Sequence, residues 1–297
     1  MANYQWYPGH MAKAKRMMQE NIKLIDLVIE LVDARAPLSS RNPDIDELGR
    51  NKARLILLNK SDLADAGKNK LWINYFSEKG FYAVEINSKN GHGIKSIHGV
   101  VQEACREKIE RDRKRGILNR PVRAMVVGIP NVGKSTFINS FAGKACTKTG
   151  NKPGVTKGKQ WIRLNKSVEL LDTPGILWPK FDDPAVGLHL AMIGSINDEI
   201  VYSDELACEL IRFMMSAYPG ALEKRYELEA VESDAYETLQ AICISRRCFL
   251  KGETPDMMKA ASMVVEDFRS GRLGRISLET PDNIQEEPSE KGATLGK

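Results

Sequence analysis

The residues with the clearest chemistry lie in one stretch, residues 128–136, with the sequence Gly-Ile-Pro-Asn-Val-Gly-Lys-Ser-Thr. It fits the pattern G-x-x-x-x-G-K-[ST], in which glycines let the backbone turn its N–H groups toward the phosphates of a nucleotide. Lys134 is predicted to reach the β- and γ-phosphates, and the hydroxyl of Ser135 to coordinate Mg²⁺. The other loop residues predicted to contact the nucleotide are Asn131, Val132, Gly133 and Thr136.

The segments on either side of this loop are those that the pattern requires. Residues 122–127 form a short β-branched run typical of a buried strand. Residues 135–142 carry apolar side chains at helical spacing, namely Phe137, Ile138 and Phe141. A strand, a glycine loop and the start of a helix therefore follow one another, and the helix N-terminus itself attracts anions.

Two loops earlier in the chain have residues suited to binding a purine base. The first fits N-K-x-D directly after the strand expected at residues 54–58, and it consists of Asn59, Lys60, Ser61 and Asp62. The carboxylate of Asp62 is expected to accept two hydrogen bonds from guanine that adenine cannot donate, so this loop selects GTP over ATP. The second loop is a looser match after the strand expected at residues 81–86, and its backbone is suited to contact the guanine oxygen. Its residues are Asn87, Ser88 and Lys89.

Two further pieces lie after the phosphate loop and are expected to respond to the γ-phosphate. Asp172 begins a D-x-x-G stretch and is expected to hold Mg²⁺ through water, while the N–H of Gly175 senses the γ-phosphate. Thr156 is the expected switch threonine, which closes on Mg²⁺ when the γ-phosphate is present. Together these pieces predict a GTPase with GTP as its substrate and Mg²⁺ as its cofactor.

These pieces stand in an unusual order, since the base-binding loops precede the phosphate loop. Alternating strands and helices predict an α/β fold with a mostly parallel six-stranded sheet covered on both faces. Such a sheet tolerates circular permutation when its original termini are joined, here by residues 103–120. We therefore expect a circularly permuted P-loop GTPase domain over residues 1–180, with the ligand at the carboxyl edge of the strands.

The pattern changes near Pro184, where strand signals stop and helical ones dominate. Helices are expected at residues 203–217, 221–229, 236–244 and 256–269, which predicts a small all-α domain over residues 184–279. The last helix has an apolar face suited to core packing and a basic end suited to RNA phosphates. The basic residues are Lys259, Arg269, Arg272 and Arg275. The polar tail, residues 280–297, is expected to be disordered.

The composition limits the class of protein. With 297 residues, 42% of them hydrophobic and 28% charged, the chain has room for two ordinary soluble domains. Its net charge of +5 permits a nucleic-acid partner without requiring one. Five scattered cysteines without C-x-x-C spacing argue against a disulfide framework and suit a reducing cytosol. No stretch has the length needed to span a bilayer, so we expect a cytoplasmic protein with no membrane partner.

The motif order and two short markers carry a resemblance to a known family. The markers are Trp6-Tyr7-Pro8-Gly9-His10-Met11 and Asp33-Ala34-Arg35, and residues 268–274 add to them. The chain resembles the circularly permuted GTPases, most closely the ribosome biogenesis GTPase A family, over essentially its whole length. This resemblance implies GTP hydrolysis coupled to late assembly of the bacterial large (50S) ribosomal subunit. It also implies that this subunit and its rRNA are partners, and that the helical domain binds RNA.

The group that orients the attacking water is not in its usual place. Many GTPases carry a glutamine directly after D-x-x-G, whereas this chain has Ile176, which cannot orient water. His10 is our candidate, because the helix expected at residues 11–24 takes the place of the helix that leads away from D-x-x-G in the unpermuted fold. The alternative is that His10 packs against or caps that helix.

Asn131 and the role of hydrolysis each leave two interpretations open. An asparagine at this place resembles GTPases that bind K⁺ beside the phosphates, where the cation offsets developing charge, and the alternative is a structural hydrogen bond within the loop. The chain is either an enzyme whose ribosomal partner stimulates turnover or a GTP-sensing RNA-binding placeholder whose hydrolysis serves only its release. We expect it to act as a monomer.

Overall fold

The computed structural model describes residues 9–118, 120–146, 160–164, 167–178, 181, 183–196 and 203–283. Within them a six-stranded sheet has the order β3-β2-β1-β4-β6-β5, in which only β5 is antiparallel to its neighbour. The strands are β1 (Leu27–Asp33), β2 (Ala53–Asn59), β3 (Tyr82–Glu85), β4 (Val122–Val127), β5 (Gln160–Arg163) and β6 (Val168–Asp172). The predicted mostly parallel sheet is confirmed.

Strands β1 and β2 lie inside the sheet because their side chains are apolar on both faces. All seven residues of β1 are buried, as are all but the first of β2, which fits parallel strands covered by helices on both sides. One face packs on the aromatic side chains of α3 (Ala66–Glu78). The larger core cluster includes side chains from α1 (Gly9–Asn21), α4 (Ile97–Ala104) and α6 (Lys134–Ala142).

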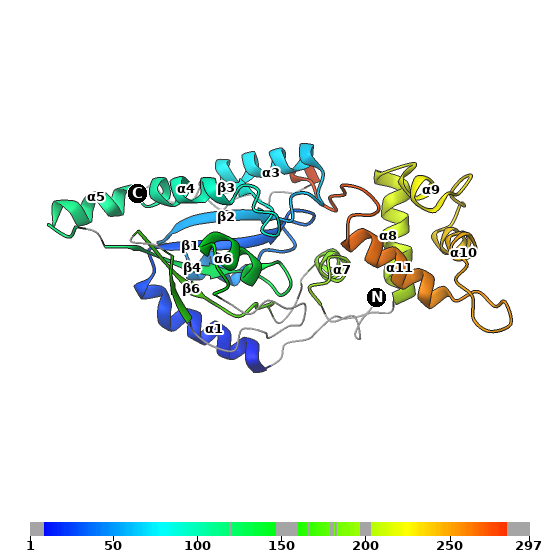
Figure 1. Ribbon diagram of the computed structural model, residues 1–297, viewed down its shortest axis with the longest axis horizontal. Coiled ribbons are helices and arrows are strands. Elements are labelled where there is room, and N and C mark those ends of the chain that lie inside the picture. The colour runs from blue at the N-terminus through cyan, green and yellow to red at the C-terminus, as the bar shows by residue number, and fades with distance from the viewer. Residues whose placement is uncertain are drawn as a thin grey trace, which may run out of the picture.

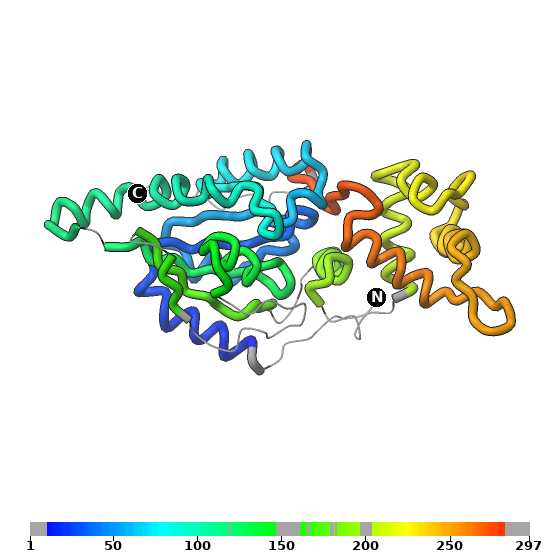
Figure 2. The backbone as a smooth tube through the Cα atoms, in the orientation of Figure 1, coloured from blue at the N-terminus to red at the C-terminus, as the bar shows by residue number. Residues whose placement is uncertain are grey.

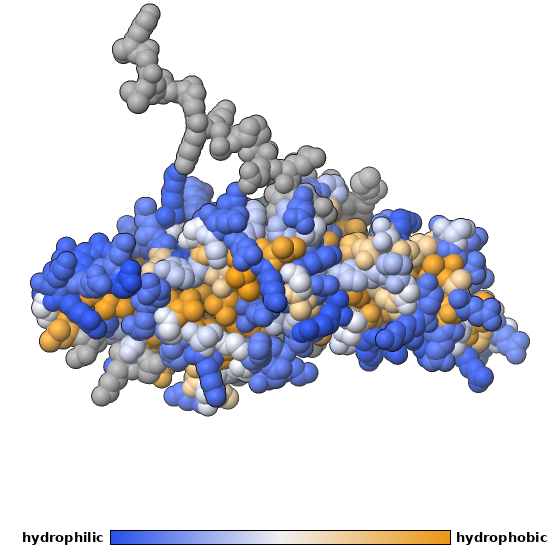
Figure 3. Space-filling model, turned by 90° about the horizontal axis from the view of Figure 1, so that it is seen from above, coloured by the Kyte–Doolittle hydropathy of each residue, from blue (hydrophilic) through white to orange (hydrophobic). Residues whose placement is uncertain are grey.

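The connection from β3 to β4 is the predicted join of the permuted fold. A 3₁₀ turn (Ile94–Ser96) leads into α4, and α5 (Arg106–Lys114) follows after a break at Cys105. The sequence of residues 94–113 predicts one continuous helix, and this prediction is wrong. The two halves differ in environment, since α4 buries Ile97 and Val101 whereas α5 buries none of its residues. Figure 1 shows α5 projecting beyond the sheet, and Figure 3 shows the hydrophilic surface at that end.

A group of helices lies at the opposite end of the molecule (Figure 1). Its members are α8 (Ser203–Ala217), α9 (Ala221–Tyr226), α10 (Ala235–Ser245) and α11 (Met257–Arg269), which are the four predicted helices. Between this group and the sheet lies α7 (Pro184–Met192), which the prediction omitted. Its start signal is present in the sequence, because the Asp183 side chain caps the N-terminus and Pro184 occupies the first turn.

After α11 the chain returns to the sheet, as Figure 2 shows. Residues 271–279, here called the return strap, hydrogen-bond to the loops that follow β1 and β2. Ile276 N donates to Leu63 O (2.9 Å), and Leu278 N donates to Arg35 O (2.7 Å). The tail was expected to be disordered from residue 280, but a 3₁₀ turn (Pro281–Asn283) follows the strap, and the rest of the tail lies outside the described residues.

The remaining features of the fold are a short helix and the absence of a membrane-spanning helix among the described residues. A single helical turn, α2 (Asp44–Leu48), lies between β1 and β2. Among the described residues, no helix is both long and apolar enough to cross a membrane.

Candidate nucleotide-binding site

The phosphate loop connects β4 to α6 at the carboxyl edge of the sheet, and its glycines stand where no side chain fits. Gly133 has a φ of +98°, and a Cβ added to it would lie 2.5 Å from the side-chain nitrogen of Asn59. Gly128 has a φ of +153°, and its added Cβ would lie 2.6 Å from Leu31 O. The close approach of neighbouring groups explains why both positions require glycine. The strand, loop and helix predicted around this motif are confirmed.

Lys134 is buried at the start of α6, where backbone carbonyls of the phosphate loop surround its ammonium. Its ammonium donates to the carbonyls of Gly128 (3.0 Å) and Ile129 (2.7 Å). Burial lowers the pKa of Lys134 to about 8, although the nearby Asp172 carboxylate acts in the opposite direction. A buried cation held by carbonyl dipoles is suited to receive an anion, as the predicted phosphate contact requires.

The D-x-x-G stretch packs directly against the phosphate loop. Asp172 is buried at the end of β6, and the Thr173 hydroxyl donates to Val126 O (2.6 Å). A Cβ added to Gly175 would lie 2.7 Å from the Lys134 ammonium. The backbone of Gly175 is therefore close enough to contact an anion that Lys134 binds. The hydroxyl of Ser135 and the carboxylate of Asp172 are hard oxygen donors that fit Mg²⁺. When bound there, Mg²⁺ would offset the negative charge of the phosphates.

The position that carries glutamine in many GTPases is occupied by a core side chain. Ile176 is 2% exposed, and its N–H donates to Gly128 O (3.4 Å). Its apolar side chain is turned into the core and offers no group that could hold water. His10 is the second residue of α1, but its side chain lies outside what the structure describes, as does Thr156 altogether. Both assignments stay predictions.

Asn59 joins the base-binding loops to the phosphate loop. Its side-chain nitrogen donates to Val132 O (2.8 Å), and its side-chain oxygen accepts the N–H of Ser88 (3.0 Å). The residue therefore holds three motifs together, a structural role that sequence reasoning did not assign. Asp62 is exposed at the carboxyl edge of the sheet, where its carboxylate is accessible to a nucleotide base.

The rest of the base-binding side is ordered by short local contacts. Ser61 N donates to Ile86 O (3.1 Å), which joins the loop after β2 to the loop after β3. Asn87 shapes this second loop by accepting the N–H of Lys89 (2.8 Å) on its side-chain oxygen. The contact between this loop and the guanine oxygen stays a prediction.

Lys60 in N-K-x-D has a carboxylate partner that sequence reasoning missed. Its ammonium lies 2.9 Å from the carboxylate of Asp33, at the end of β1. Burial acts to raise the pKa of Asp33, but the charges of Arg35 and Lys60 outweigh it and hold the pKa well below its usual range. The only signal in the sequence was the Asp33-Ala34-Arg35 marker, to which no role was attached.

Asn131 makes a structural hydrogen bond, but to a residue outside its own loop. Its side-chain nitrogen donates to Gly194 O (2.7 Å), just after α7. The bond joins the phosphate loop to the helical end of the molecule rather than closing within the loop. The K⁺ role stays a prediction.

The basic end of α11 differs from expectation, because most of its cations are used within the chain. The Arg269 side chain donates to carbonyls at the end of α7, Arg272 pairs with Asp267 (2.6 Å), and Arg275 donates to Asp62 O (3.1 Å). Of the four residues predicted to contact RNA phosphates, only Lys259 has neither an ion pair nor a side-chain hydrogen bond among the described residues.

Comparison with known proteins agrees with this geometry. Residues 123–244 match the family described as 50S ribosome-binding GTPase. The Ribosome biogenesis GTPase A of Bacillus cereus is 50% identical over 283 residues, which cover 95% of this chain and 96% of that protein. The chain belongs to the ribosome biogenesis GTPase A family. A member from Thermotoga maritima is 31% identical and covers 94% of this chain and 95% of its own.

Solved structures of the family agree with the fold. The crystal structure of GNP-bound YlqF from T. maritima has a TM-score of 0.68 and 28% identity, covering 92% of this chain and 100% of that one. The GDP-bound structure of the same protein has a TM-score of 0.65 and 26% identity, covering 90% and 100%. This ribosome biogenesis GTPase A family member is therefore a GTP hydrolase on a circularly permuted P-loop fold, as predicted.

Proposed function

We propose that this GTPase promotes late assembly of the large (50S) ribosomal subunit, and that the particle stimulates its hydrolysis of GTP. The observation that carries the proposal is the buried Ile176 in the place of a water-orienting glutamine. With that side chain in the core, the isolated protein hydrolyses GTP slowly, and a partner completes the site. The family description, 50S ribosome-binding GTPase, supports the large subunit as that partner.

His10 orients the attacking water in this proposal, and Lys134 stabilises the phosphates. The support for His10 is the position of α1, which begins at Gly9 and leads through a 3₁₀ turn into β1. Strand β1 pairs with β4, the strand that enters the phosphate loop. A histidine near neutral pKa can accept a hydrogen bond from water at physiological pH. Its effect is expected on the stimulated rate rather than on GTP binding.

Two cations complete the proposed site. Ser135, Thr156 and Asp172 hold Mg²⁺, and Asn131 contributes to a K⁺ site beside the phosphates. K⁺ there would offset charge that develops between the β- and γ-phosphates, the role of an arginine finger elsewhere. Rates of hydrolysis compared in matched KCl and NaCl test this directly, and equal rates would remove K⁺ from the proposal.

The helical domain, residues 184–279, binds rRNA in this proposal while the protein acts as a cytoplasmic monomer. Because Arg269 and Arg275 are used within the chain, the phosphate contacts come from other basic residues. Exposed candidates at the far end of the domain are Arg247, Lys251 and Lys259. Phosphate contacts of this kind position a protein on RNA without reading its sequence.

The experiment is steady-state hydrolysis of GTP in K⁺ and Mg²⁺, with large subunits, with small subunits and alone. Stimulation of at least about tenfold by large subunits only is the expected result, and it should be lost in His10→Ala with GTP binding unchanged. No stimulation, with tight GTP binding, would sink the ribosomal part. Unstimulated hydrolysis combined with GTP-dependent release from large subunits would favour the alternative, a GTP-sensing RNA-binding placeholder.

A further inference from the structure

Asp33 and Arg35 form a buried pair that the nucleotide-binding motifs leave unexplained. Their side chains are 1% and 2% exposed. The Arg35 guanidinium donates two hydrogen bonds to the carboxylate, from Nε to Oδ1 (2.9 Å) and from Nη2 to Oδ2 (2.8 Å). A two-point contact between a planar guanidinium and a carboxylate fixes orientation as well as distance. The position of each side chain therefore determines that of the other.

Each member of the pair also holds a different part of the molecule. The Asp33 carboxylate is 2.9 Å from the Lys60 ammonium in the base-binding loop. Arg35 Nη1 donates to the carbonyls of Phe268 (3.5 Å) and Arg269 (3.3 Å), the last residues of α11. Its guanidinium also lies 5.0 Å from the centroid of the Phe268 ring. Helix C-terminal carbonyls and an aromatic face both favour a cation. Direct contacts therefore run from α11 to the lysine of N-K-x-D.

Arg269 continues these contacts toward the phosphate side. Its side chain donates to the carbonyls of Ala191 (2.8 Å) and Met192 (3.1 Å) at the end of α7. Gly194, two residues further on, accepts the Asn131 side chain of the phosphate loop (2.7 Å). We call the ends of α7 and α11, residues 191–194 and 268–269, the α7–α11 corner. This corner contacts the phosphate loop directly and the base-binding loop through Arg35 and Asp33.

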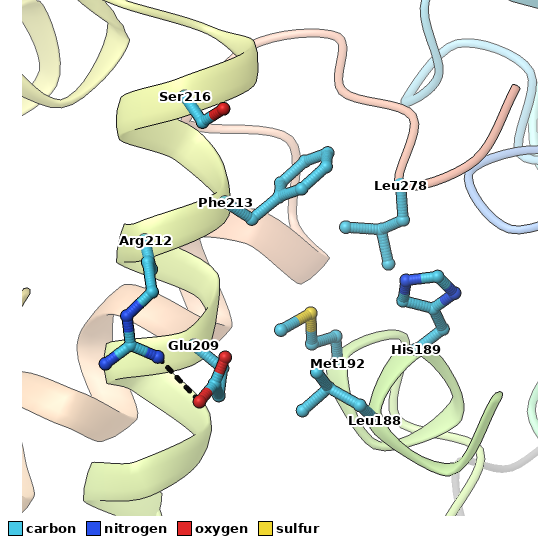
Figure 4. A pocket seen from close by; sticks show the side chains of 8 residues that line it. All are labelled: Leu188, His189, Met192, Glu209, Arg212, Phe213, Ser216 and Leu278. Carbon is cyan, nitrogen blue, oxygen red and sulfur yellow. Dashed lines mark ion pairs between the residues drawn. The ribbon is translucent and has the colours of Figure 1, made fainter. Parts of the chain in front are cut away.

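Figure 4 shows the outer side of this region, where α7, α8 and the return strap line a cavity of about 300 Å³. Phe213 of α8 points toward Leu278 of the strap, and Leu188 and Met192 of α7 also line the cavity. Polar side chains also line this cavity, among them His189 and the ion pair between Arg212 and Glu209 (2.6 Å). The polar contacts of the α7–α11 corner are one specific connection between the helices and the nucleotide loops. The return strap provides a second, because Ile276 N donates to Leu63 O and the Arg275 side chain donates to Asp62 O.

We propose that Asp33 and Arg35 are positioning residues through which the α7–α11 corner holds Lys60 in place for the guanine base. Lys60 adopts a left-handed backbone with a φ of 59°, which a lysine does not favour by itself. Its ion pair with Asp33 supports the side chain in that conformation. Docking of the helices thus contributes to nucleotide affinity, and a ligand that displaces α11 must change that affinity. The inference depends on guanine binding at N-K-x-D and not on the ribosomal role.

A double-mutant cycle on nucleotide affinity tests the proposal. Arg35→Gln is expected to weaken GDP and a non-hydrolysable GTP analogue alike by about tenfold, the loss typical of one charge-assisted hydrogen bond. Both nucleotides are affected because they share the base. In the Lys60→Gln background the same change is expected to have no further effect, since Arg35 acts through Lys60. An additive loss, or a loss confined to the GTP analogue, overturns the proposal.

Two further variants separate positioning from folding. Arg54→Gln removes a buried arginine that pairs with Glu30 (2.9 Å) and Asp46 (3.0 Å) near the amino edge of the sheet. It is expected to reduce stability while both nucleotide affinities stay within about twofold. Phe268→Leu perturbs the α11 side mildly and serves if Arg35→Gln does not fold. It is expected to weaken both nucleotides about two- to fivefold, and unchanged affinity would exclude α11 from the mechanism.

Discussion

When the protein binds GTP, Lys134 is expected to take up a proton. The number of protons taken up per GTP depends on the pH relative to the Lys134 pKa of about 8. With that pKa, Lys134 in the nucleotide-free protein is expected to be about 90% charged at pH 7, about half charged at pH 8 and about 10% charged at pH 9. A bound phosphate stabilises the ammonium and raises its pKa well above 9, so the complex holds the proton at all three values. Proton uptake per GTP bound is therefore about 0.1, 0.5 and 0.9, and affinity falls about tenfold from pH 7 to pH 9.

Calorimetry measures this uptake without any assumption about affinity. The heat of binding a non-hydrolysable GTP analogue is compared at pH 8 in two buffers with different ionisation enthalpies. The nucleotide phosphates are already ionised at this pH, so they contribute no proton. Lys134→Arg is the matched control, because its guanidinium stays charged throughout and no proton is taken up. Uptake near zero in the native protein, or equal uptake in Lys134→Arg, would show that Lys134 is not the group that takes up the proton.

Three further predictions concern the same site. Lys134→Met should raise the free energy of unfolding of the nucleotide-free protein at pH 7, measured by urea titration, by up to about 3 kcal/mol, because the buried charge is gone. The same variant should not bind GTP, so adding GTP to the urea titration should leave its free energy of unfolding unchanged. Asn59→Ala should lower the free energy of unfolding by about 2–3 kcal/mol, since two buried backbone groups lose their partner, whereas Asn90→Ala on the surface should change it little. Gly175→Ala should weaken GTP binding by about tenfold or more, because its methyl group would lie 2.7 Å from the Lys134 ammonium. Gly99→Ala in α4, where an added Cβ meets nothing within 4 Å, should leave GTP binding unchanged and stabilise the helix.

Much of the site was predictable because its chemistry is local in sequence. The phosphate loop, N-K-x-D and D-x-x-G each place their functional groups within a few residues, directly after an apolar strand. A parallel sheet then brings the ends of its strands to one edge regardless of their order in the chain. For this reason the circular permutation hid neither the fold nor the motifs.

The misplaced elements had weaker local signals. The helix expected over residues 94–113 breaks at Cys105, because only its first half meets the core. The prediction for α7 failed even though Asp183 and Pro184 mark its start, since its short apolar segment shows little helical periodicity.

The reaction class, the nucleotide and the mostly parallel six-stranded sheet could be predicted from the sequence alone, because spacing within motifs and apolar runs are properties of adjacent residues. Which cations are used within the chain depends on how the helices pack against the sheet. Arg269 and Arg275 look like RNA-binding residues in the sequence, yet they hydrogen-bond to backbone carbonyls. The tertiary structure also joined Arg35 to the end of α11, more than 230 residues away. Hydrogen bonds require atoms within about 3 Å, and packing of the helices against the sheet brings such distant groups that close.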